Sequence, residues 1–75
     1  MDKKLKQQKL KIWKDNLKQL EKELEQVLIK KGQAAQEGDL SENAAYTMAI
    51  EDAETTRVRI DEVKKIIADL EKGKT

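Results

Sequence analysis

The chain has 75 residues and a formal net charge of +1, and 41% of its residues are charged, while Pro, Cys, His and Phe are absent. A chain this short forms one small domain, residues 1–75, without a core large enough for an enclosed pocket. The lack of Cys excludes disulfides and thiolate metal sites. No apolar run approaches the roughly 20 residues of a membrane span, and the lysine-rich start lacks the apolar region of a signal peptide. We therefore expect a cytoplasmic protein with no membrane segment.

The first predicted element is a helix over residues 3–36. Its seam positions follow one another by alternating steps of three and four, which is typical of a left-handed coiled coil. These positions are Leu10, Trp13, Leu17, Leu20, Leu24, Val27, Lys31 and Ala34. Gly32 lies within this helix, where it costs roughly 1 kcal/mol relative to Ala.

A tip is predicted over residues 37–41. Gly38 suits the left-handed conformation that ends many helices. Asp39 and Ser41 are both suitable N-caps for the next helix, and Asp39 with Glu42 three residues later resembles a capping box. The two acids therefore have two interpretations. They cap a helix, or they are exposed oxygen ligands that bind Mg²⁺ weakly without further ligands from elsewhere.

The second predicted helix covers residues 42–72 and repeats the spacing of the first. Its seam positions are Tyr46, Ala49, Ala53, Thr56, Ile60, Val63, Ile67 and Leu70. Each pairs with one position of the first seam so that the two residue numbers sum to 80. Because one fold-back point pairs every layer, the pattern predicts an all-α fold, an antiparallel two-helix coiled-coil hairpin with an acidic tip. Such an intramolecular hairpin is expected to be a monomer.

Charge is segregated along the chain. Residues 1–35 carry ten Lys against five acids, a net charge of +5, whereas residues 36–62 carry eight acids against two Arg, a net charge of −6. Residues 63–75 return to +2, with four Lys against two acids. Folding back near residue 40 therefore gives a rod with an acidic tip and a basic open end. On charge pattern alone, the lysines form a solvated surface. Sequence-specific DNA binding is not expected, since no recognition-helix motif is present.

A resemblance to a known family is carried by the run from Glu37 to Tyr46, which reads E-G-D-L-S-E-N-A-A-Y. This run resembles the tip motif G-D-L-S-E-N-A-E-Y of the bacterial Gre transcript-cleavage factors. The run from Arg59 to Val63 is similar to the family's R-I-x-x-L-E in the returning helix. The resemblance is specific over residues 34–70, and over residues 1–33 it is one of pattern and position. The family's N-terminal domain is an antiparallel coiled-coil hairpin, in agreement with the pairing of the two seams.

The resemblance implies a transcription elongation factor that is a cofactor protein and not an enzyme. Gre factors insert their hairpin through the secondary channel of RNA polymerase, where tip carboxylates help to hold a second Mg²⁺ and position the water that cleaves backtracked RNA. Matched position by position, Asp39 and Glu42 are those acids. Ser41, Asn43 and Tyr46 match positions that shape or orient the tip. The implied partner is bacterial RNA polymerase, and the basic patch of Gre N-terminal domains implies that the lysines contact nascent RNA. The implied cofactor is a Mg²⁺ shared with the polymerase, with none bound stably by the chain alone.

Three features depart from the family's pattern. Ala45 replaces the family's glutamate before the tyrosine, and the neighbourhood of Leu28 to Gly32 lacks the usual Arg-Pro element. The chain also ends at Thr75, where the family's FKBP-like globular domain begins, so no C-terminal globular domain is expected within it. Two alternatives to cleavage stay open. One is an inhibitor that occupies the channel without stimulating cleavage, and the other is a structural coiled-coil module whose seam assembles copies of itself.

Overall fold

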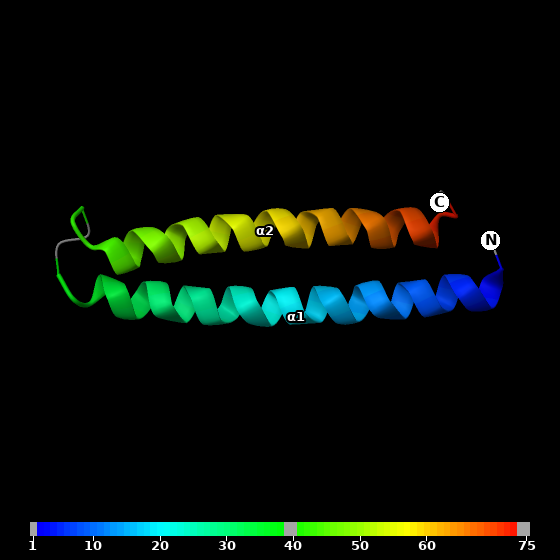
Figure 1. Ribbon diagram of the computed structural model, residues 1–75, viewed down its shortest axis with the longest axis horizontal. Helices are drawn as coiled ribbons and strands as arrows, with labels where there is room; N and C mark the ends of the chain where they lie inside the picture. Colours follow the sequence, from blue (N-terminus) through cyan, green and yellow to red (C-terminus); the bar gives the residue numbers. More distant parts are fainter. Residues whose placement is uncertain (1, 39–40, 74–75) are drawn as a thin grey trace.

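Two long helices packed against each other make up the fold. The computed structural model describes residues 2–38 and 41–73, and it contains α1 (Lys3–Ala35) and α2 (Ala44–Glu71). The helices run antiparallel, so that the start of α1 and the end of α2 lie together, opposite the turn that joins the helices (Figure 1). The molecule is a slender rod with principal extents of 55 × 16 × 12 Å. The predicted all-α hairpin is confirmed.

Local signals fix the limits of α1. The Asp2 side chain accepts a hydrogen bond from the Lys4 N–H at 3.4 Å, which satisfies one of the unpaired donors at the start of the helix. At the other end the C-cap is Gln36, in right-handed conformation. Gly38 follows two residues later with a φ of +122°, a conformation that side chains disfavour. The expected positive φ of Gly38 is thus present, but beyond the cap.

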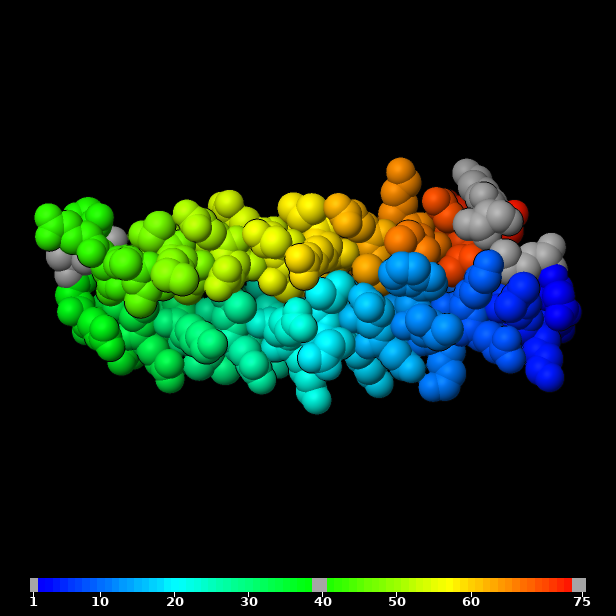
Figure 2. Space-filling view, in the orientation of Figure 1, coloured from blue at the N-terminus to red at the C-terminus, as the bar shows by residue number. Residues whose placement is uncertain are grey.

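The predicted seam is the interface between the helices. All sixteen predicted positions are buried or half-buried. Among the described residues, the buried apolar side chains all lie on this seam: Leu20, Ala34, Ala49, Ala53, Ile60, Val63, Ile67 and Leu70. Figure 2 shows the two helices in contact along the rod. The spacing therefore identified the residues of the core correctly.

The size of the buried side chains changes along the rod. A cluster of buried apolar side chains extends from the middle of the rod toward the open end: Leu20, Ile60, Val63 and Ile67. Partly buried side chains pack against this cluster from α1: Leu10, Trp13, Leu17 and Leu24. Toward the tip the buried side chains are alanines. Because burial stabilises in proportion to apolar area, most of the hydrophobic stabilisation resides in the half away from the tip.

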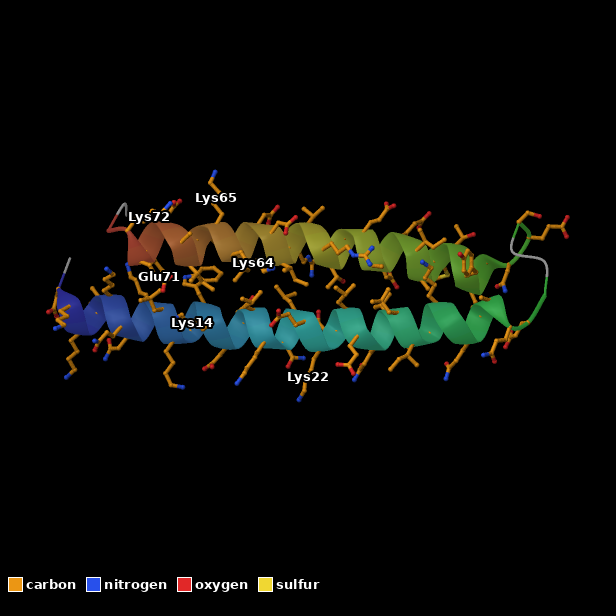
Figure 3. The ribbon with its side chains drawn as sticks, turned by 180° about the vertical axis from the view of Figure 1, so that it is seen from behind. Lys14, Lys22, Lys64, Lys65, Glu71 and Lys72 are labelled. Atoms are coloured by element: carbon orange, nitrogen blue, oxygen red, sulfur yellow. The ribbon has the colours of Figure 1, made fainter. Side chains whose placement is uncertain are left out.

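The open end carries weak polar links between the helices. The Lys6 ammonium donates to the backbone carbonyl of Glu71 at 3.2 Å, and Lys14 Nζ lies 3.8 Å from Glu71 Oε2 (Figure 3). Lys65 points away from α1, and Lys22 points away from α2. In the described part of the chain, neither helix is long and apolar enough to cross a membrane.

Candidate functional site at the hairpin tip

The candidate site is the tip, defined here as residues 36–43, which connects the two helices at the end remote from the termini (Figure 1). Asp39, one of the two predicted acids, lies outside the described residues. Glu42, the other, is fully described and exposed to solvent, as is Ser41. The geometry of the site is therefore given by Glu42 and the residues that follow it.

The start of α2 differs from the prediction. The helix begins at Ala44 rather than at residue 42, and its N-cap is Asn43. The Asn43 Oδ1 accepts a hydrogen bond from the Tyr46 N–H at 3.1 Å. The prediction that Asp39 or Ser41 caps α2 is wrong, and so is the expected capping box, because Glu42 precedes the cap instead of lying within the first turn.

Asn43 also contacts the other helix. Its Nδ2 donates to the backbone carbonyl of Ala34 at 2.7 Å, and the residue is half-buried. Ala34 lies in the last turn of α1, where carbonyls have no partner within the helix. The same carbonyl accepts from the Glu37 N–H at 3.1 Å. The second contact of Asn43 explains why this residue, among several polar residues in a row, becomes the cap.

Tyr46 is held at the seam. Its side chain is half-buried, and the Lys31 ammonium lies 6.0 Å from the centroid of its ring. A cation at this distance over an aromatic face is attracted by the ring's negative surface. Tyr46 is therefore half-buried at the seam, as the spacing predicts, and it lies about one helical turn beyond the cap.

Glu42 is available for an external partner. Within the described residues its carboxylate makes no hydrogen bond or ion pair, and no group of three or more Asp, Glu, His or Cys side chains converges. Such a group is what a metal ion held by protein carboxylates requires. Glu42 fits a Mg²⁺ site only as a contributor of oxygen ligands to an ion whose other ligands come from elsewhere.

A shallow groove beside the tip was not predicted from the sequence. It lies between the helices where the seam residues are small, and Met48, which is 62% exposed, forms part of it. Its lining combines apolar and charged side chains: Val27, Lys30, Gln33, Ala34, Glu37, Ala45, Met48, Ala49 and Asp52. The available signal was a methionine at a solvent-facing position of α2, beside a seam of alanines. Ala45, which replaces the family's glutamate, is exposed in the first turn of this helix.

Fold and site together define a class, that of antiparallel coiled-coil hairpins that present an exposed acidic residue at the end of a slender rod. A family model described as "Transcription elongation factor, N-terminal", that of GreA and GreB, matches residues 4–71. The chain therefore belongs to the Gre family of N-terminal domains, which gives it a role in transcription elongation and implies that it acts on RNA polymerase. The match includes the first helix, where the sequence resemblance rested on pattern and position. No curated protein and no solved structure matches the chain.

Proposed function

We propose that the chain inserts its tip into the secondary channel of RNA polymerase and promotes cleavage of backtracked RNA by the polymerase. In this role Asp39 and Glu42 supply carboxylates at the polymerase active centre. The polymerase performs the reaction, and the chain acts as its cofactor protein.

The observation that carries the proposal is the position of Glu42. The main alternative explanation for an acid at a helix start is N-capping, and that task belongs to Asn43. Glu42 is exposed and precedes the cap, so its carboxylate is not needed to start α2. A carboxylate that is exposed and that no other described residue contacts through a hydrogen bond or ion pair can bind a cation from another molecule at little cost in free energy.

The shape of the molecule supports insertion. Its cross-section is 16 × 12 Å over a length of 55 Å, and the buried residues nearest the tip are alanines. The buried seam residues nearest the tip are small, whereas the bulky apolar layers lie toward the open end. A slender rod with this distribution of core residues can carry an acid into a confined channel while most of its stabilising contacts remain behind.

The chemistry asked of the chain is limited to positioning and charge. Glu42 would contribute an oxygen ligand and would orient water near the scissile phosphate. The contribution of a bound Mg²⁺ would be to stabilise the attacking and leaving oxygens of the phosphoryl displacement. Because two carboxylates bind this ion weakly without further ligands, affinity would come from the combined site.

The test is RNA cleavage by a backtracked bacterial polymerase, measured at increasing concentrations of the chain. The wild-type chain is expected to accelerate cleavage, and Glu42→Gln together with Asp39→Asn should abolish the acceleration. Glu54→Gln is the matched control, because Glu54 is an exposed acid of α2 remote from the tip and its replacement makes the same change in chemistry. Acceleration that survives in the double variant would contradict the roles of the two acids.

Ala45 favours a second candidate function, that of an inhibitor. The exposed first turn of α2 carries alanine where the family has an acid, so the tip has one carboxylate fewer. A chain that occupied the channel without stimulating cleavage would slow intrinsic cleavage and compete with an active Gre factor in the same titration. No effect at any concentration would favour the structural module, which sedimentation would reveal as an assembly of copies.

A further inference from the structure

We propose that Asn43 is the positioning residue of the tip, because its side chain ties the end of α1 to the start of α2 and thereby fixes the direction of Glu42. The contacts of Asn43 carry this assignment, and its consequence for RNA cleavage rests on the proposed function.

Asn43 forms hydrogen bonds with backbone groups at the ends of both helices at once. Its Oδ1 accepts a hydrogen bond from the Tyr46 N–H at the start of α2. Its Nδ2 donates a hydrogen bond to the Ala34 carbonyl at the end of α1. A carboxamide has a donor and an acceptor on neighbouring atoms, whereas a carboxylate only accepts. Since an N–H must meet the oxygen and a carbonyl must meet the NH₂ group, only one orientation of the carboxamide satisfies both contacts.

The backbone of Asn43 is fixed as well. Its carbonyl accepts from the Thr47 N–H at 3.1 Å, the first hydrogen bond of α2. Asn43 is thus held at three atoms, and one of these contacts crosses between the helices. Glu42 is joined to this residue by one peptide unit. Fixing Asn43 therefore fixes the point from which the Glu42 side chain departs, and displacements near 1 Å already reduce rates of well-positioned reactions.

Two substitutions remove the contact of Asn43 with Ala34, which we call the brace, and keep the N-cap. Ser and Asp are N-caps about as good as Asn, so Asn43→Ser and Asn43→Asp keep the contact with α2. Neither variant retains the NH₂ group that reaches Ala34. Asn16→Asp, an exposed change in the middle of α1, controls for the added charge. Asn43→Ala removes both side-chain contacts, the one with Ala34 and the one with Tyr46, and shows the additional effect of losing the cap.

Nuclear magnetic resonance of the chain alone tests the brace without polymerase. The wild-type chain should show a scalar coupling across the hydrogen bond from Asn43 Nδ2 to the Ala34 carbonyl carbon. The backbone order parameter of Glu42 should lie near 0.85, roughly the value of rigid backbone, and should fall below about 0.6 in Asn43→Ser. Absence of the coupling, or an unchanged order parameter in both capping variants, would overturn the proposal.

The cleavage assay supplies the functional measurement. In Asn43→Ser, the maximal rate should fall by about tenfold, while the concentration for half-maximal stimulation should change less than about twofold. A merely unfolded variant would instead lose apparent affinity, and its circular dichroism would report the unfolding. If the wild-type chain does not stimulate cleavage, the proposed function fails, and the resonance measurements alone decide whether Asn43 fixes Glu42.

Discussion

The Lys31 ammonium lies over the ring of Tyr46, 6.0 Å from its centroid, and this pair links the helices at the first seam layers behind the tip. A double-mutant cycle of Lys31→Met and Tyr46→Leu should give a coupling free energy of about 0.5 kcal/mol, the low end for a partly solvated cation over an aromatic ring. Urea unfolding followed by circular dichroism measures each corner of the cycle. A coupling near zero would mean that the two side chains contribute independently.

Gly32 offers a stabilising substitution. It is exposed and lies inside α1, and a methyl group there would meet nothing within 4 Å apart from its chain neighbours and the backbone of its own helical turns. Gly32→Ala should therefore raise the free energy of unfolding by about 1 kcal/mol and the Tm by about 4–8 °C. Gly38→Ala is a control expected to have the opposite effect. Gly38 has a φ of +122°, which alanine disfavours, so this substitution should destabilise the chain. Thermal melts of the two variants should move in opposite directions.

Two valines of α2 show how the stabilising effect of a side chain depends on its burial. Val63 is 6% exposed and belongs to the apolar cluster, whereas Val58 is 56% exposed. Val63→Ala should lower the free energy of unfolding by about 2 kcal/mol, through lost burial and the cavity left behind. Val58→Ala should change it by less than about 0.5 kcal/mol. Equal losses in urea titrations would be incompatible with the observed pairing of the helices.

The ion pair between Lys14 and Glu71 at the open end should contribute little to the free energy of unfolding. The Glu71 carboxylate lies 3.8 Å from Lys14 Nζ, and both side chains are more than half exposed. Exposed pairs of this kind contribute little because water and salt screen them. Glu71→Gln should therefore change stability by less than about 0.5 kcal/mol. A larger change that vanished at high salt would instead show a network of charges at this end.

Ala45 can be converted to the acid found in the family. A glutamate in the exposed first turn of α2 faces the positive end of the helix dipole, so Ala45→Glu should stabilise the chain by about 0.3–1 kcal/mol. If the tip promotes cleavage, the additional carboxylate should also raise the maximal cleavage rate. Ala44→Glu, one position earlier in the same turn, is the matched control for the dipole effect. Equal cleavage by both variants would remove the special role of position 45.

The hairpin was predictable because its seam obeys a simple rule of spacing, repeated over eight layers and matched between two halves of the chain. The cap of α2 was not. Asp39, Ser41 and Asn43 have similar local preferences for an N-cap. The choice among them depends on the Ala34 carbonyl, which lies nine residues before Asn43 and approaches it only once the helices have paired. Tertiary contact therefore decided a question that local propensity left open.

The candidate site was predictable only in part. The tip motif identified Glu42, and the structure leaves this residue exposed and outside the helix cap. The roles of Asp39 and Glu42 in cleavage stay predictions. The groove around Met48 could not be foreseen, because it arises from the packing of two helices where alanines meet.

The antiparallel arrangement has a mechanical consequence. The start of α1 and the end of α2 lie together at the open end of the rod. A force that pulls these two ends apart would therefore load one seam layer at a time, beginning with Leu10 and Leu70. The bulky side chains Trp13 and Ile67 would meet this load next. A force applied between the tip and the open end would instead be shared by every layer. The hairpin should therefore resist being pushed or pulled along its length far better than it resists being peeled open.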